Sequence, residues 1–494
     1  MTAFWRAAII AALLPFVAQA QDVTLTSRDG ALSISGLLQG YDGELFRVQS
    51  TYGLLTIDAS GVICDGPACP DLTAPKAVIR IVGEADAGAA LMPGLIAGFA
   101  TSRGLVYAAP LAPDGPATLT DPLTQKVLAE ISFQPMRVAQ AEAALRDGAA
   151  ELMLASATNS AFGTKALALD ALVPIVATDN PLAEISTTNL AAALAGKVTN
   201  WNQIGGPDMP LVLHGLEPDS DLERALSARL GRNNSATITH PDLKSLAQAV
   251  ARDPWALAVT GQISAQPAHI LPLADSCGFP LLPNRLAVKA EDYPLTLPIY
   301  LLTPPRRLSL MAREFLEYLA LPAAQSAIAA TGYIDRSPES QPMTADGLRL
   351  INAIQGAGAE TTLEDLKHLA TVMDGADRLS LTFRFQEGSD LLDGGSQENL
   401  LDLARLIETD AFRNVSLVLA GFSDGSGAAA TNLALAQSRA ETVLAALRAL
   451  VPDVAEADLP QIVAFGEALP MACDQTAAGR RLNRRIEVWL RPKP

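Results

Sequence analysis

Residues 422–447, FSDGSGAAATNLALAQSRAETVLAAL, hold the pattern that decides the fold of the C-terminal part of the chain. An apolar run ends just before Asp424, a glycine-containing loop follows, and an alanine-rich stretch with helical spacing extends from Asn432 to Leu450. This succession predicts a strand, a turn and a long helix. Flanking segments predict two more strands, LSLTFRF and RRIEVWL, and one more helix, NLLDLARLI. The expected order is βαβαβ, an α/β arrangement.

A second motif follows at residues 464–490, AFGEALPMACDQTAAGRRLNRRIEVWL. Together the two motifs resemble the OmpA-like family, in which an Asp is followed at fixed distances by Gly, Asn, Leu and Arg-Ala. The matching positions in the first motif are Asp424, Gly427, Asn432, Leu435 and Arg439-Ala440, and those in the second are Gly466-Glu467, Pro470, Thr476, Gly479-Arg480 and Asn483-Arg484-Arg485. Cys473 stands where a polar residue is more usual. The resemblance covers residues 377–494 and implies a domain that binds diaminopimelate of peptidoglycan.

The chemistry of that ligand suits the residue types in the first motif. A wall peptide with a free amino-acid end offers an ammonium and a carboxylate close together. Asp424 can accept from the ammonium, and the planar guanidinium of Arg439 matches a carboxylate with two hydrogen bonds. Asn432 and Arg439 are seven positions apart, so they share one helix face. The alternative is that Asp424 and Arg439 form only a surface ion pair, worth roughly 0–1 kcal/mol.

The predicted peptidoglycan-binding residues are Asp424, Arg439, Asn432, Leu435 and Arg485. For Arg485, as for its neighbours Asn483 and Arg484, the main expected role is structural, with a supporting contact to the ligand.

Residues 75–336 alternate apolar strands with alanine-rich helices, which indicates a second α/β domain. The stretch DALVPIVATDNPLAEISTTNLAAALAGKVTNWNQIGGPDMP, at residues 170–210, resembles the periplasmic phosphate-binding proteins of ABC transporters. So does the later run FLEYLALPAAQSAIAATGYI, at residues 315–334. The resemblance implies a two-lobed periplasmic-binding-protein fold of type 2. Binding must still be argued from the residues of the site.

The loops expected to hold phosphate are altered in this chain. A helix N-terminus binds an anion through backbone N–H groups, yet Glu84 and Asp86 place carboxylates where hydroxyls are expected. An expected Ser-Arg pair reads Ser156-Ala157, and an expected Ser-Gly-Thr reads Ser220-Asp221-Leu222. Because carboxylates repel phosphate, we expect no tight phosphate binding. The cleft residues are then candidates for a cationic ligand or for protein docking, and the two serines for ordinary loop and cap roles. These candidates are Glu84, Asp86, Ser156, Ser220 and Asp221.

The N-terminal part of the chain predicts export. Arg6 precedes an apolar run that ends in Ala18-Gln19-Ala20, the pattern of a cleavable signal peptide over residues 1–20. Residues 21–74 alternate apolar and polar positions, which predicts a small antiparallel β module. Cys64 and Cys69 lie close enough to form a disulfide in an oxidising compartment.

Two further cysteines, Cys277 and Cys473, fall in different predicted domains. A bridge between domains, buried thiols and unpaired thiols all stay open for them. A Pro- and Ser-rich stretch, RSPESQP, opens a predicted linker with helices over residues 337–376.

Charge and motifs narrow the function. A net charge of −17 argues against nucleic acid as a partner. The four histidines are scattered, so no metal or cofactor is expected, and no hydrolase, zinc-protease or P-loop motif occurs. No apolar segment in the mature chain is long enough for a transmembrane helix.

We therefore expect an α/β and α+β multidomain protein rather than an enzyme. It would be a periplasmic binding protein, associated with the cell wall or outer membrane, that attaches to peptidoglycan and presents its middle domain to a small molecule or envelope protein. The alternative is a solute receptor for phosphate or another small ligand of an ABC transporter.

Overall fold

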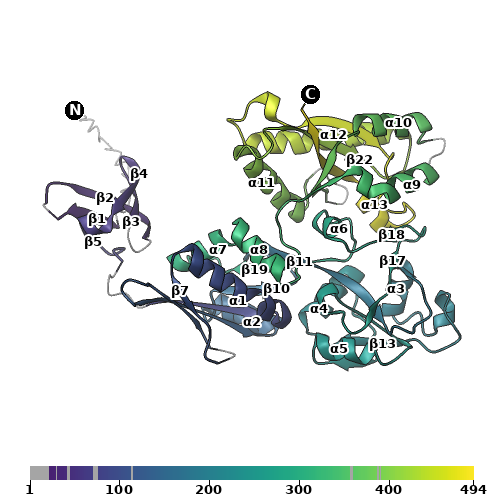
Figure 1. The fold of residues 1–494 in the computed structure, drawn as a ribbon, viewed down its shortest axis with the longest axis horizontal. Helices are drawn as coiled ribbons and strands as arrows, with labels where there is room; N and C mark the ends of the chain where they lie inside the picture. Colours follow the sequence, from purple (N-terminus) through teal and green to yellow (C-terminus); the bar gives the residue numbers. More distant parts are fainter. Residues whose placement is uncertain are drawn as a thin grey trace, which may run out of the picture.

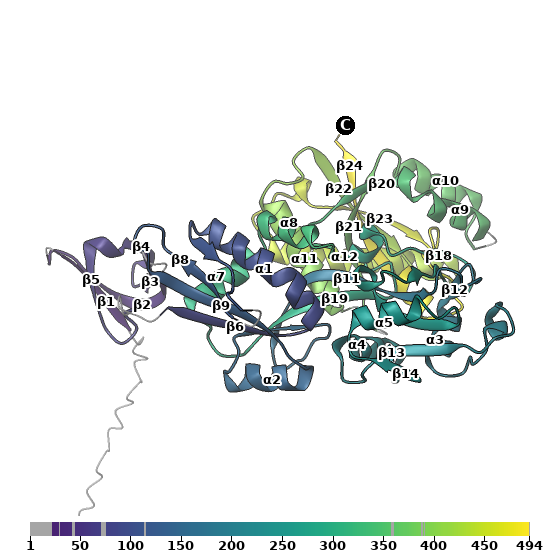
Figure 2. The same cartoon turned by 60° about the horizontal axis from the view of Figure 1, so that its bottom comes forward.

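The computed structural model of the chain describes residues 22–28, 30–41, 45–70, 76–112, 115–356, 360–386, 389 and 391–493. The predicted signal peptide, residues 1–20, lies outside the described residues. Three parts are visible in Figure 1: a small β module at the N-terminal end, a two-lobed middle part and a C-terminal domain above the junction of the lobes. The β module lies at the far end of the first lobe, away from the C-terminal domain, in both views (Figures 1 and 2). This arrangement confirms the α/β and α+β multidomain class.

The N-terminal module is one antiparallel sheet in the order β4-β3-β2-β1-β5. Its strands alternate between buried and exposed side chains, so Val23, Leu25, Phe46 and Val48 form a core on one face. Cys64 and Cys69 form a disulfide at the end of the last strand. The strands are β1 Val23–Ser27, β2 Ser33–Tyr41, β3 Leu45–Ser50, β4 Gly53–Asp58 and β5 Val62–Asp65.

In the first lobe of the middle part, helices pack on one end of an 11-stranded sheet. Helix α1 buries Leu91, Leu95 and Phe99 at four-residue spacing, and the Phe99 ring meets Phe315 edge-on at 5.3 Å between centroids. The elements are β6 Ala77–Gly83, α1 Ala85–Ser102, β7 Val106–Ala108, β8 Ala117–Thr120, β9 Val127–Pro135, α2 Val138–Asp147, β10 Leu152–Ala155, α7 Leu310–Tyr318 and α8 Pro322–Ala330.

Two long antiparallel strands, β11 Gly163–Val176 and β19 Thr296–Thr303, connect this lobe to the second. The second lobe contains β12 Ile185–Ser186, α3 Thr187–Leu194, β13 Val212–Leu216, α4 Asp221–Leu230, β14 Ile238–His240, α5 Leu243–Val250, β15 Ala256–Gly261, β16 His269–Ile270, β17 Leu273–Ala274, β18 Pro280–Leu281 and α6 Arg285–Lys289. Strands β12, β17 and β18 form a separate small sheet, which lies toward the C-terminal domain (Figure 1).

The C-terminal domain is a five-stranded sheet in the order β20-β21-β24-β22-β23. The predicted order βαβαβ was incomplete, because strand β23 and the short helix α13 lie between the long helix and the last strand. The apolar run of β23 is short and ends at Gly466, so it gave little periodicity to detect. The elements are β21 Asp377–Phe383, α11 Gly394–Glu408, β22 Val415–Phe422, α12 Ala429–Leu450, β23 Gln461–Gly466, α13 Ala477–Asn483 and β24 Arg485–Pro492.

Small residues let α12 approach the sheet closely. Ala436 and Ala440 are fully buried, and a Cβ on Gly421 of β22 would lie 2.5 Å from the carbonyl oxygen of Ala436. This contact fixes the helix beside the strand whose end carries Asp424.

The segment before Asp377 also packs on this sheet. Strand β20 Ser340–Pro342 pairs with β21, and two helices follow it, α9 Gly347–Gly356 and α10 Leu363–Val372. Leu366 and Leu369 of α10 join a core that includes Trp489. Among the residues that the structure describes, no helix has both the length and the apolar character needed to cross a bilayer.

Candidate functional site

Asp424 lies at the start of the loop that leaves strand β22. Its side chain is mostly buried, with 7% of the residue surface exposed. Oδ1 accepts from the N–H of Ser426 at 3.0 Å, and Oδ2 lies 3.2 Å from Nη1 of Arg484. The carboxylate lies at the carboxyl end of a strand, and its position is fixed from two sides.

The loop around Asp424 is close to other carboxylates. Asp474 accepts from the N–H of Gly425 at 2.8 Å, and a Cβ on Gly425 would approach Asp474 Oδ2 to 2.8 Å and Glu467 Oε2 to 2.9 Å. A larger residue at this position would therefore require both carboxylates to move. Burial raises the pKa of Glu467, and the charges of Glu360, Asp474 and Asp424 raise it further. The loop thus has a negative local potential that attracts an ammonium group.

Helix α12 carries the other predicted ligand residues. The guanidinium carbon of Arg439 lies 5.7 Å from the centroid of the Phe385 ring, a cation–π arrangement that holds its plane. Asn432 is buried near the start of the helix, and its Nδ2 donates to Glu467 at 3.4 Å. Leu435 is 43% exposed. The helix therefore combines a buried amide, an exposed apolar side chain and an oriented arginine.

Arg485, for which a mainly structural role with a supporting ligand contact was predicted, lies in the core of the C-terminal domain. The residue is completely buried, and its guanidinium donates to Glu487 at 2.7 Å, to the carbonyl of Asn483 at 3.1 Å and to the carbonyl of Leu469 at 2.8 Å. The same group covers the Phe422 ring at 4.3 Å. Burial lowers the pKa of Arg485 to about 10. Because all of its surface is buried, Arg485 is structural.

Arg484, its neighbour, has the contact to the site instead, through the ion pair with Asp424. The sequence motif contains both arginines, but Arg484 is the C-cap residue of helix α13 and strand β24 begins at Arg485, so the two side chains have different surroundings. Asp474 and Glu467 were not among the predicted site residues: Glu467 belongs to the second motif but was given no role, and Asp474 lies at a position that the motif does not include.

In the middle part, the N-terminus of helix α1 is occupied by the chain's own carboxylate. Glu84 is the N-cap residue, and its side chain accepts from the N–H groups of Asp86 and Ala87. Burial raises the pKa of Glu84 to about 7, and the charges of Asp86 and Asp221 raise it too. These N–H groups are the ones that would meet a phosphate at this helix end. Glu84 therefore takes the place of an anionic ligand.

A second carboxylate lies across the cleft, on helix α4 of the other lobe. Asp221 accepts from the backbone N–H of Ser156, which follows strand β10 of the first lobe. Burial raises the pKa of Asp221 to about 6. Ser220 caps α4 by accepting from the N–H of Glu223 at 3.4 Å. Ser220 thus has the N-cap role that the sequence allowed, and Ser156 is a backbone donor between the lobes.

The cleft has further interactions between the two lobes. Burial and the charge of Asp242, the N-cap residue of α5, raise the pKa of Asp86. Arg137, the N-cap residue of α2, pairs with Glu217 and Asp219 of the other lobe. Arg137 was not predicted, because it lies far in the sequence from the expected Ser-Arg pair. Of the five predicted cleft residues, Glu84, Asp86, Ser156 and Asp221 interact at one acidic junction between the lobes, and Ser220 caps the helix that carries Asp221. Their role in ligand binding stays a prediction.

The middle and C-terminal parts are joined by a buried ion network. Asp292, 6% exposed, forms an ion pair with Arg378 at 2.7 Å and accepts a hydrogen bond from Arg384 at 2.8 Å. Arg384 also donates to the carbonyl of Ala290 at 2.7 Å. A disulfide between Cys277 and Cys473 joins the same two parts. Within the described ranges, no three His, Cys, Asp or Glu side chains gather in a way that would hold a metal ion.

Comparison with known families identifies two domains. Residues 137–323 match the model of a PBP superfamily domain, and residues 384–484 match the model of the OmpA family. The comparison with curated proteins finds no match.

Among solved structures, an ABC-type phosphate transport receptor from Vibrio cholerae is 19% identical over 52% of this chain and 99% of its own, with a TM-score of 0.41. PstS from Borrelia burgdorferi is 13% identical over 53% of this chain and 99% of its own, with a TM-score of 0.37. Because both TM-scores are low, neither structure bears on the ligand of this chain. The two family matches agree with both resemblances seen in the sequence, so the chain combines a PBP superfamily domain with a C-terminal OmpA-family domain.

Proposed function

We propose that the protein is a periplasmic, non-catalytic binding protein that attaches to the cell wall through its OmpA-family domain, with diaminopimelate as the ligand. The observation that carries this proposal is the position of Asp424, a mostly buried carboxylate fixed in a glycine-rich loop within the matched domain. A carboxylate held in this way is prepared to accept hydrogen bonds from an ammonium group without reorganising.

The surroundings of Asp424 favour a zwitterionic ligand end. Carboxylates of Glu467 and Asp474 lie beside the loop and attract the ammonium. The guanidinium of Arg439, held over Phe385, supplies the planar group that matches a carboxylate. Leu435 leaves an exposed apolar surface on the same helix for the aliphatic chain between the two polar ends.

The PBP domain is proposed to act as a presented binding module whose phosphate site is degenerate. Glu84 occupies the helix N-terminus where an anion would bind, and Asp221 accepts a hydrogen bond from the backbone N–H of Ser156. Any small molecule that enters this cleft meets carboxylates, so a cation suits it better than phosphate. A solute receptor for a cationic ligand is therefore the second candidate. In either case the proposed location is the periplasm, at the wall or the inner side of the outer membrane.

Sedimentation with insoluble peptidoglycan tests the proposal. The mature chain should sediment with sacculi that contain diaminopimelate, and Asp424→Ala or Arg439→Ala should stay in the supernatant. Arg448→Ala is the matched control, because Arg448 lies in the last turn of the same helix and pairs with the exposed Glu456. Sacculi with lysine in place of diaminopimelate lack the neighbouring carboxylate and should bind less. Equal sedimentation of wild type and both site variants would contradict the proposal.

A further inference from the structure

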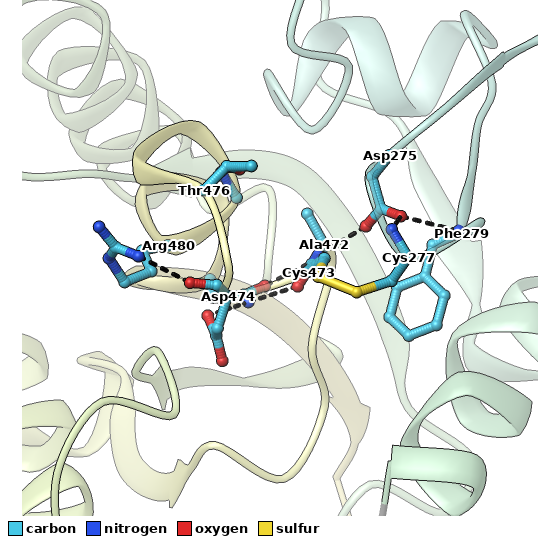
Figure 3. The surroundings of a disulfide bond; sticks show 10 residues. Asp275, Cys277, Phe279, Ala472, Cys473, Asp474, Thr476 and Arg480 are labelled. Carbon is cyan, nitrogen blue, oxygen red and sulfur yellow. Dashed lines mark hydrogen bonds between the residues drawn. A yellow bond between two sulfur atoms is a disulfide. The ribbon is translucent and has the colours of Figure 1, made fainter. Parts of the chain in front are cut away.

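A loop of the PBP domain reaches the wall-binding side of the OmpA-family domain. Asp275, which follows strand β17, accepts from the N–H groups of Cys277 and Phe279 at 2.8 Å each. Its second carboxylate oxygen accepts from the N–H of Cys473 at 2.6 Å, and Cys277 forms the disulfide with Cys473. Figure 3 shows Asp275 and the disulfide holding Cys473 from the same side. The backbone of Cys473 is thus held by one covalent bond and one charged hydrogen bond from the other domain.

The next residue, Asp474, connects Cys473 to the proposed ligand loop. One oxygen of its carboxylate accepts from the N–H of Gly425 at 2.8 Å, and the other accepts from Nδ2 of Asn483 at 2.8 Å. Its backbone carbonyl accepts from Arg480 at 2.7 Å, a bond visible in Figure 3. Gly425 directly follows Asp424 in the chain. Any displacement of Asp474 therefore moves the backbone that carries the ligand-binding carboxylate.

The space around Cys473 leaves it little freedom to shift. A Cβ on Gly479, in helix α13, would lie 1.9 Å from the carbonyl oxygen of Cys473. Asn483 also accepts from the N–H groups of Met471 and Ala472 and donates to the carbonyl of Ala472. The segment from Met471 to Asp474 is therefore fixed from the α13 side by close packing and from the other side by the PBP domain.

We propose that Asp474 is a positioning residue for peptidoglycan binding, and that the PBP domain holds it in place through Asp275 and the Cys277–Cys473 disulfide. This inference rests on the proposed function, because it assigns the affinity of the Asp424 loop partly to a contact with the other domain. The expected consequence is that wall affinity depends on the disulfide. The PBP domain then contributes to wall binding, in addition to being attached to the wall through the OmpA-family domain.

The experiment measures the binding of the full-length mature chain to diaminopimelate-containing sacculi at several protein concentrations. Asp474→Ala should bind about 10-fold more weakly, because it loses a charge-assisted hydrogen bond to the loop. Amide hydrogen exchange at Gly425 should accelerate in this variant while the melting temperature changes little. Asp458→Ala, an exposed carboxylate of the same domain, is the matched control.

A second arm tests the disulfide in wild type. Treatment with a dithiol breaks the S–S bond and leaves two thiols, and the dithiol becomes a disulfide as it supplies two electrons and two protons. Sacculus binding should weaken several-fold on reduction, and Cys277→Ser/Cys473→Ser should be weak in either condition. Cys64→Ser/Cys69→Ser, which removes the other disulfide, should respond to reduction as wild type does.

The outcomes separate the inference from the function on which it rests. If oxidised wild type does not sediment at all, the proposed function is wrong and the inference falls with it. If wild type sediments, and both Asp474→Ala and reduced wild type bind as tightly as oxidised wild type, the inference alone is wrong. Reduction acts on a wild-type chain that is already folded. The reduction experiment therefore tests the role of the disulfide even if a substituted variant fails to fold.

Discussion

The carboxylate of Asp292 in the PBP domain lies 2.7 Å from the guanidinium of Arg378 in the OmpA-family domain. Both side chains are almost completely buried. Arg378 also lies 3.5 Å from Glu487, which is fully buried on the neighbouring strand β24. Nearby arginines lower the pKa of Glu487 against the effect of burial, so this carboxylate stays charged. The two domains thus share a buried charge network and do not meet only at a surface contact.

Substitution of Asp292 by Ala should destabilise the chain strongly. The change leaves Arg378 and Arg384 buried without their shared carboxylate, and removal of one partner from a buried ion network costs about 3–5 kcal/mol. Chemical denaturation of the full chain is the measurement. Asp458→Ala, which alters an exposed ion pair, should change stability by less than about 1 kcal/mol. A similar small effect for Asp292→Ala would show that the interface is not formed in solution.

The two neighbouring arginines of the C-terminal motif should behave differently. Arg485→Ala removes a fully buried cation from Glu487 and from the Phe422 ring, so we expect a loss of about 3–5 kcal/mol. Arg484→Ala removes a partly exposed partner of Asp424 and should cost about 1 kcal/mol or less. Thermal denaturation of both variants beside wild type checks the difference. Equal losses would contradict the assignment of Arg485 to structure and Arg484 to the site.

Much of the fold was predictable because its signals are local in the sequence. The alternation of apolar and polar residues predicted the N-terminal sheet, and helical periodicity predicted the long helix α12. Asp424 and Arg439 were proposed as site residues because their motif resembles that of the OmpA-like family, and their role in binding stays a prediction. Strand β23 was missed because it is short and partly exposed.

Contacts between distant parts of the chain could not be predicted in this way. The disulfide of Cys277 with Cys473 joins residues 196 positions apart, and Arg137 reaches Glu217 across the cleft. No periodicity or motif reports such pairs, because they depend on how two folded units are placed. The complete burial of Arg485 could not be predicted from the sequence either. A charged residue is rarely fully buried unless it is paired, and its partner Glu487 also lies in the core.

Removal of the Cys64–Cys69 disulfide should affect only the N-terminal module. The bridge joins cysteines five positions apart, and the entropy model assigns about 2 kcal/mol to so short a loop. In Cys64→Ser/Cys69→Ser we therefore expect faster proteolysis within residues 22–70, while cleavage elsewhere keeps the wild-type rate. The fragments can be identified by mass spectrometry. Faster cleavage throughout the chain would mean that the module also stabilises the PBP domain.

Phosphate should leave the melting temperature of the wild-type chain unchanged. A ligand that binds the folded state raises this temperature, but Glu84 already uses the N–H groups that would hold the anion. Glu84→Ser removes that carboxylate and should allow a small stabilisation by phosphate. Ser220→Ala, which leaves the α1 end intact, is the control. A clear shift in wild type would favour a phosphate receptor instead of a degenerate site.

The carboxyl of Glu84 should also make stability depend on pH. Its folded-state pKa is about 7, above the ordinary value of 4.5, so the folded chain binds more protons than the unfolded chain between these values. Protonation therefore stabilises the fold, and this contribution is present at low pH and is lost as pH rises through about 7.

Glu84→Gln replaces the carboxyl by an amide and so removes its titration. The difference in melting temperature between wild type and this variant is measured at both pH values. Relative to the variant, wild type should melt roughly 2–4 °C lower at pH 8 than at pH 4.5. This shift corresponds to about 1 kcal/mol, a figure reduced because the side chain is partly exposed. Glu441→Gln, which alters an exposed carboxylate of helix α12, is the matched control. If wild type and Glu84→Gln follow parallel curves across this range, the Glu84 carboxylate is ionised throughout, and the crowding of Glu84, Asp86 and Asp221 is weaker than the structure indicates.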